Sequence, residues 1–195
     1  MRRRIALFDF DGTLTRHDTF ITFARHACGR SRFLKAFVRS LPALVRWKLG
    51  LGTNSKAKET LFGNLYRGMA ADEFERLCAT FADVVVHDLN ESGMRLLDNH
   101  LRAGDEVYIV SASPGAWIRP WSQRLGIKDV IATEIEIDTE GRLTGRFSTP
   151  NCHGAEKVRR VAAALGPLSG YESWAYGDSD SDRFILDAAD HSEMI

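Results

Sequence analysis

The chain alternates between short apolar runs and longer stretches in which apolar residues recur every three or four positions. The first run, Ile5–Phe8 in "IALFDFDGTLT", ends directly before Asp9 and Asp11. Two later segments, "DEVYIVSAS" and "SWAYGDSDSD", repeat this design, because each apolar run ends in small polar or acidic residues. Short apolar runs bounded by turn residues predict three buried strands.

Residues 18–101 show a helical period in "DTFITFARHA", "SRFLKAFVRSL", "SKAKETLFGNLYRGM" and "ADEFERLCATFADVVVHDL". We expect further helices after Pro114 and over residues 154–165, and a hairpin around residues 139–141. Strands separated by helices predict an open α/β sheet with its ligand site at the carboxyl ends of the strands. Helix breaks are expected at Gly29, Pro42, Gly50, Gly52 and Gly68.

The composition is that of an ordinary globular protein, with 195 residues that are 44% hydrophobic and 27% charged. Its three cysteines have no CxxC spacing, so a reducing cytoplasm fits best. The opening "MRRRIALFDF" is interrupted by Asp9 and predicts a strand, not a signal peptide. No apolar stretch reaches the roughly 18 residues of a membrane span. We therefore expect a cytoplasmic protein that is not an integral membrane protein.

Net charge is zero, but basic residues greatly outnumber acidic ones between Arg16 and Lys58. In residues 29–50 they alternate with apolar residues, as they do in helices that lie on a membrane surface. This pattern predicts either an anionic or membrane-associated partner for the basic segment, or a solvated helix face whose apolar side lines a small bundle. We expect no nucleic-acid partner, and the oligomeric state is left open.

Polar residues follow each predicted strand, at Asp9 and Asp11, at Ser111, and at Asp178. If the strands run parallel, these side chains converge on one edge of the sheet. Clustered carboxylates repel one another unless a cation holds them, and oxygen ligands without Cys or His favour Mg²⁺. A Mg²⁺ site beside a loop that presents backbone N–H groups is suited to phosphate chemistry.

These motifs together resemble the haloacid dehalogenase (HAD) superfamily, subfamily IB, in the branch of phosphoserine phosphatase. They are "DFDGT" at residues 9–13, the strand ending at Ser111, Lys157, and "GDSDSD" at residues 177–182. The segments "FDFDGTLT", "NCHGAEKV" and "YGDSDSD" are similar to bacterial members that include a phosphatidylglycerophosphate phosphatase. The resemblance implies a Rossmann-like core of residues 1–16 and 102–195. It also implies a helical cap of residues 17–101, inserted between the first and second motifs.

The resemblance also implies a role for each matched acidic residue. Asp9 attacks phosphorus to give an aspartyl phosphate, and Asp11 protonates the leaving alcohol and later deprotonates water. The resemblance implies that Mg²⁺ would be held by Asp9, Asp178 and the backbone carbonyl of Asp11, so Asp11 is expected among the metal-binding residues. Asp182 orients the metal or its waters.

The transferring phosphoryl oxygens are expected to contact Ser111, the backbone N–H groups near Ala112 and Ser113, and Thr13. Such contacts would stabilise negative charge as it develops on those oxygens.

Two residues, His153 and Lys157, are candidates for the cation of the third motif. Phosphoserine phosphatases often carry a lysine directly before a glycine, a place taken here by His153, whereas Lys157 lies one helical turn later. Lys157 is favoured because lysine is charged at any physiological pH. Asp18 stands where these enzymes carry a substrate-binding glutamate, and the alternative, which we favour, is a helix N-cap.

The predicted function is that of a Mg²⁺-dependent phosphatase that hydrolyses a phosphomonoester through an aspartyl phosphate. The substrate is either a small soluble ester such as phosphoserine or an anionic lipid phosphate, in which case the protein would also be membrane-peripheral. A non-catalytic phosphate-binding module is a further alternative. Members of this branch continue past "ADH" with another strand, so we expect either a very short last strand or a truncated end at Ile195.

Overall fold

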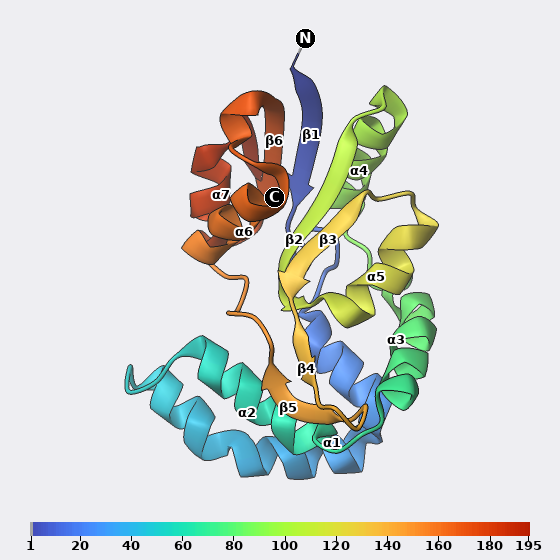
Figure 1. The fold of residues 1–195 in the computed structure, drawn as a ribbon, viewed down its shortest axis with the longest axis vertical. Helices are drawn as coiled ribbons and strands as arrows, with labels where there is room; N and C mark the ends of the chain where they lie inside the picture. Colours follow the sequence, from blue (N-terminus) through green and yellow to red (C-terminus); the bar gives the residue numbers. More distant parts are fainter. Residues whose placement is uncertain (1) are drawn as a thin grey trace.

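Five parallel strands form the central sheet of the computed structural model, which describes residues 2–195 (Figure 1). Their spatial order is β3-β2-β1-β6-β7, and all neighbouring pairs run parallel. The three strands predicted from sequence are the adjacent β2, β1 and β6, so the predicted fold class is confirmed. The bounds are β1 Arg3–Phe8, β2 Glu106–Pro114, β3 Asp129–Thr133, β6 Tyr171–Gly177 and the short last strand β7 His191–Met194.

Helices cover both faces of this sheet, because successive strand residues point to opposite sides. Ile5 and Leu7 pack with α6 (Ala155–Leu165) and α7 (Arg183–Ala188). Phe8 belongs to a larger cluster on the other face, with residues of α4 and α5. Those two helices span Glu91–Ala103 and Gly115–Arg124. The sheet is thus the middle of three layers, as its buried apolar runs require.

Three further helices, α1 (Thr19–Lys48), α2 (Asn54–Tyr66) and α3 (Ala71–Val85), lie beyond the carboxyl ends of the strands (Figure 1). The antiparallel pair β4 (Ile135–Ile137) and β5 (Leu143–Phe147) forms the predicted hairpin, and β5 packs against α2. Helix α4 contacts β1 and β2 although it falls within the predicted cap range. The predicted division at residues 16 and 102 stays a prediction.

The predicted helix break at Pro42 is wrong, because α1 continues through Pro42 to Lys48. A proline removes one backbone hydrogen bond, and packing of the same helix against α2 compensates for this loss. Gly29 does interrupt the helical geometry, with a φ of 70° that favours glycine, so α1 is kinked there. Within residues 2–195, no helix has both the length and the apolar character needed to span a bilayer.

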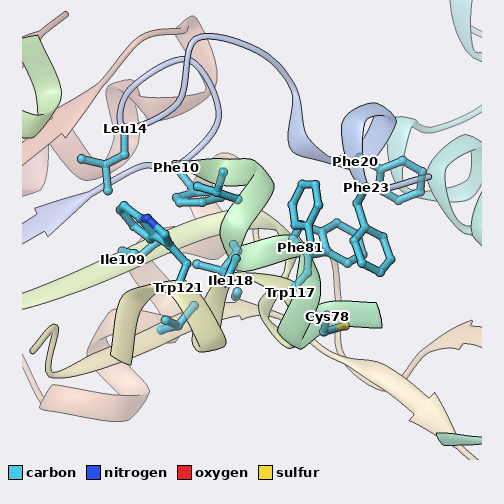
Figure 2. Packing of buried hydrophobic residues seen from close by; sticks show 14 of the residues in the cluster. Phe10, Leu14, Phe20, Phe23, Cys78, Phe81, Ile109, Trp117, Ile118 and Trp121 are labelled. Carbon is cyan, nitrogen blue, oxygen red and sulfur yellow. The ribbon is translucent and has the colours of Figure 1, made fainter. Parts of the chain in front are cut away.

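An aromatic cluster joins the first turns of α1 to α3 and α5 (Figure 2). The rings of Phe23 and Trp117 stack with centroids 4.5 Å apart, and Phe81 meets Phe23 edge to face at 5.1 Å. The indole Nε1–H of Trp117 also donates to Thr19 Oγ1 at 3.3 Å. This packing therefore fixes Thr19, at the start of α1, beside the strand ends.

Candidate active site

The parallel register brings the acidic residues after β1 and β6 together. The backbone N–H of Asp9 donates to the carbonyl of Tyr176 at 2.9 Å, which extends the pairing of the two strands. Carboxylate oxygens of Asp9, Asp178 and Asp182 all lie within 4.8 Å of one another. The structure therefore brings together three of the four residues of the predicted metal set, and Asp11 is the one outside the cluster.

Lys157 lies between two of these carboxylates. Its ammonium group donates to Asp9 Oδ1 at 2.6 Å and to Asp182 Oδ1 at 2.5 Å, and its side chain is only 2% exposed. Burial lowers the pKa of Lys157, but the charges of Asp9 and Asp182 outweigh burial and raise the pKa above its ordinary value. Lys157 is therefore a fixed positive charge in contact with the predicted nucleophile.

The two carboxylates that bind Lys157 differ in their pKa. Burial, which outweighs the nearby Lys157, raises the pKa of Asp9 to about 7. Burial also acts on Asp182, but Lys157 and the bonds from Ser179 outweigh it and lower the pKa of Asp182. Asp182 is thus the permanent counter-charge of Lys157, and Asp9 is the group whose ionisation depends on added positive charge.

Asp11 lies outside the carboxylate cluster, because its oxygens are bound elsewhere. Oδ1 accepts from the backbone N–H of Thr19 at 2.7 Å and from its hydroxyl at 2.5 Å, while Oδ2 accepts from the hydroxyl of Ser113 at 2.5 Å. Burial, followed by the charge of Asp18, raises the pKa of Asp11. A raised pKa and a fixed orientation suit a proton donor. The side chain of Asp11 does not join the metal cluster, so only its backbone carbonyl is left for the predicted metal role.

Two glycines allow the acidic loops to approach closely. A Cβ on Gly12 would lie 2.1 Å from Asp178 Oδ2, and its φ of +85° is itself unfavourable for other residues. A Cβ on Gly177 would lie 2.4 Å from the Cβ of Asp182. The carboxylate of Asp182 accepts from the N–H groups of Asp178 and Ser179 at 3.3 and 3.1 Å. Asp182 therefore shapes the loop that carries Asp178. These contacts with the loop explain why Asp182 is fully buried.

The predicted phosphoryl-binding residues differ in their burial and in their hydrogen bonds. Ser111 and Ser113 are fully buried, and the Ser111 hydroxyl accepts the N–H of Ser113 at 3.0 Å. Ala112, which lies between them in the sequence, lines the cleft over the acidic cluster. Thr13 is also fully buried, and its hydroxyl has no hydrogen-bond partner among the described residues. The roles predicted for these residues stay predictions, and Ser113 has the additional role of holding Asp11.

A cleft of about 330 Å³ lies over the acidic cluster, between the strand ends and α2. Sequence reasoning missed part of this wall, since Asn54 and Lys58 reach the cleft from the first turns of α2. Their i, i+4 spacing places both on one helix face, and this was the only signal in the sequence. The cleft is lined by Asp9, Asp11, Gly12, Arg16, Asp18, Asn54, Lys58, Ala112, His153, Lys157, Asp178, Ser179 and Ser181.

His153 and Asp18 lie at this cleft without direct contacts to the carboxylate cluster. Burial lowers the pKa of His153, and the charges of Lys58 and Lys157 lower it further, so its imidazole is neutral at physiological pH. This supports Lys157 as the cation of the third motif. The carboxylate of Asp18 accepts from the N–H of Phe20 at 2.8 Å, so the predicted N-cap of α1 is confirmed.

The carboxylate cluster fits a hard divalent cation. Its donors are all carboxylate oxygens, and burial together with the charge of Asp182 raises the pKa of Asp178, as unscreened repulsion requires. Lys157 neutralises only part of this negative charge. Asp9 and Asp178 are therefore the side chains that would hold Mg²⁺.

Comparison with known proteins assigns the chain to a family. Residues 6–187 match the family described as haloacid dehalogenase-like hydrolase. The chain belongs to this family and is an enzyme of the hydrolase class. Among its relatives, protein CicA of Caulobacter vibrioides is 30% identical over 187 residues, which cover 95% of this chain and 83% of that protein. A phosphoserine phosphatase of Mycobacterium tuberculosis is 29% identical over 93% of this chain and 61% of its own length.

Solved structures share the fold. A protein of unknown function from Bordetella pertussis Tohama I has a TM-score of 0.84 at 28% identity, and the match covers 98% of this chain and 89% of that one. A substrate-bound phosphoserine phosphatase has a TM-score of 0.64 at 18% identity over 98% of this chain and 85% of that one. At 18% identity this second likeness concerns the fold alone.

Proposed function

We propose that this hydrolase is a phosphatase that cleaves a phosphomonoester through an aspartyl phosphate on Asp9. The observation that carries the proposal is the separation of two carboxylates with different partners. Asp9 contacts the ammonium group of Lys157, whereas Asp11 is held by Thr19 and Ser113. These different partners support attack by Asp9 and proton transfer by Asp11.

In the first step a carboxylate oxygen of Asp9 forms a bond to phosphorus, and the bond from phosphorus to the ester oxygen breaks. Asp11, whose pKa is raised by burial, gives a proton to the departing alkoxide, which leaves as the alcohol. In the second step Asp11 takes a proton from water, whose oxygen attacks phosphorus and releases Asp9. The two steps return both carboxylates to their starting states.

Positive charge supports both steps, because a carboxylate repels a phosphate dianion. Lys157 lies 2.6 Å from Asp9, so its charge also reaches the oxygens of a phosphoryl group at Asp9. Mg²⁺ held by Asp9 and Asp178 would supply further charge against the nucleophile and the phosphate. Asp182 keeps Lys157 in place and takes no part in bond making.

Two substrate classes are compatible with the cleft. The relative from M. tuberculosis is named a phosphoserine phosphatase, which favours a small soluble ester. The resemblance to a phosphatidylglycerophosphate phosphatase and the basic residues Arg16 and Lys58 at the cleft favour an anionic lipid phosphate. Both substrates are phosphomonoesters, so the reaction proposed at Asp9 is the same for either.

Release of phosphate from para-nitrophenyl phosphate tests the proposal. We expect turnover with Mg²⁺, loss of turnover with a chelator, and recovery when excess Mg²⁺ is returned. Phosphoserine and a short-chain lipid phosphate assayed in parallel will rank the two substrate classes. Binding of inorganic phosphate without turnover of any ester would instead support a non-catalytic module.

A further inference from the structure

Helix α1 exposes a continuous apolar stripe on its outer face. Six large apolar side chains from the second half of α1 and the loop after it are 40–68% exposed. Their spacing of three or four residues along the helix places the first five on one face. We call this set the outer stripe; its members are Leu34, Val38, Leu41, Val45, Leu49 and Leu51.

The outer stripe is distinct from the face that packs against α2. Ala36 and Ser40 are buried on that inner face, where the Ser40 hydroxyl accepts from Asn64 of α2 at 2.8 Å. Arg32 likewise donates to the carbonyl of Leu65 at 2.9 Å. The inner face therefore satisfies the prediction of a helical bundle, and the outer stripe is an additional apolar surface.

Basic residues border the outer stripe on both sides. Lys35, Arg39 and Arg46 lie along one border, at spacings of four and seven residues. Arg30 and Lys48 lie along the other border. They are 18 residues apart, which is about five full helical turns, so both face the same side of the helix. All five residues are exposed. No acidic residue occurs between Asp18 and Glu59, so nothing within α1 neutralises these borders.

We infer that the outer stripe docks on the surface of an anionic lipid bilayer, with α1 lying in the plane of the interface. An apolar face flanked by lysine and arginine fits this environment, because apolar side chains enter between the headgroups while the basic ones meet anionic phosphates. A second copy of this chain fits poorly, since pairing two outer stripes would bring two uncompensated basic borders together. Charge complementarity thus selects the bilayer.

Docking through the outer stripe would place the cleft near the lipid headgroups. Leu51 is three residues from Asn54, which lines the cleft together with Lys58. Three residues span at most about 11 Å of extended chain. The inference is independent of the ester that is cleaved, because none of the stripe residues lines the cleft.

Co-sedimentation with vesicles tests the inference. We expect the protein to bind vesicles of equal parts phosphatidylglycerol and phosphatidylcholine at low salt, and to bind pure phosphatidylcholine vesicles at least about tenfold more weakly. The double variant Val45→Ser, Leu49→Ser should lose about tenfold or more in binding to the anionic vesicles. Its matched control is Val86→Ser, Ile137→Ser, which removes two exposed apolar side chains outside α1 and should bind like the original protein.

A second pair of variants tests the basic borders. Lys35→Gln, Arg46→Gln should weaken binding to anionic vesicles about tenfold at low salt, and its control, Arg95→Gln, Lys128→Gln, should not. Equal binding to neutral and anionic vesicles, or an unchanged Val45→Ser, Leu49→Ser variant, would overturn the inference. So would a stable dimer in sedimentation equilibrium that this variant abolishes.

Hydrolysis of para-nitrophenyl phosphate in solution separates this inference from the proposed reaction. Lost vesicle binding with unchanged hydrolysis in the Val45→Ser, Leu49→Ser variant supports membrane docking. Equal loss of both would overturn it, because the substitutions would then act through the fold. An inactive protein that still binds anionic vesicles through the outer stripe would refute the phosphatase proposal and leave the docking surface standing.

Discussion

The acidic site at the strand ends and the outer face of α1 differ in how their charged side chains are exposed to solvent and paired. Lys157 is 2% exposed and bound by two carboxylates, whereas the basic residues of α1, such as Lys35 and Arg46, are exposed. A buried charge depends on each of its partners, and the loss of one partner leaves the other unsatisfied. Exposed charges act nearly independently and are screened by salt.

Different responses to substitution follow from this contrast. Single changes at the strand ends should have large effects on turnover, because Asp9, Lys157 and Asp182 form one connected set. Changes in α1 should have small effects that add over several residues.

Asp9→Asn should have the largest effect, a loss of turnover of more than about 1,000-fold, because an amide is a poor nucleophile of nearly the same shape. Turnover of para-nitrophenyl phosphate measures the loss, and circular dichroism checks the fold. Retained activity in a folded Asp9→Asn protein would reject Asp9 as the nucleophile.

Lys157→Ala should lower turnover about 100-fold or more, because the transferred phosphoryl group loses a fixed positive charge. It should also lower the free energy of unfolding by about 3–5 kcal/mol, since Asp9 and Asp182 lose their buried partner. His153→Ala is the matched control and should change both quantities much less. Should His153→Ala prove the more damaging, the cation of the third motif has been misassigned.

Asp178→Asn should raise the Mg²⁺ concentration needed for half-maximal activity by about tenfold or more, because one charged ligand becomes neutral. A Mg²⁺ titration of turnover measures this shift. Ser181→Ala, a change in the same loop, is the control and should leave the titration in place. An unchanged midpoint in Asp178→Asn would count against its role as a ligand.

Lys58→Gln should have the smallest effect, a fall of about three- to tenfold in kcat/KM, because Lys58 is only half-buried in the cleft wall. We expect most of the change in KM and a weaker effect at high salt. Lys56→Gln, two residues earlier on another face of α2, is the control. A loss in kcat as large as that of Lys157→Ala would mean that Lys58 takes part in the chemistry.

The residues at the strand ends were easier to predict from the sequence than the surfaces of the helices. Asp9 and Asp178 were predicted to converge because strand ends obey a local rule: an apolar run stops, polar residues follow, and parallel pairing brings the ends to one edge. Lys157 was predicted through the family resemblance. Its contacts with both Asp9 and Asp182 required the packed fold, because α6 and the loop after β6 are far apart in the sequence.

The helical region was less predictable, because helical periodicity says that a face is apolar and does not say what covers it. Asn54 and Lys58 reach the cleft only because α2 lies over the strand ends. The apolar residues of α1 were assigned to one face, whereas the structure divides them into an inner face against α2 and the outer stripe. Pro42 was expected to end a helix, and packing of α1 against α2 overrides that local preference.

The attack by Asp9 is tested most directly by trapping the phosphoryl group. A ³²P-labelled phosphomonoester is mixed with excess enzyme and Mg²⁺, quenched in acid within the first turnover, and digested for peptide mapping. We expect acid-stable, base-labile label on the peptide that carries Asp9, and none in Asp9→Asn. Turnover without label on that peptide, or acid-stable label on a peptide carrying Asp178, would contradict attack by Asp9.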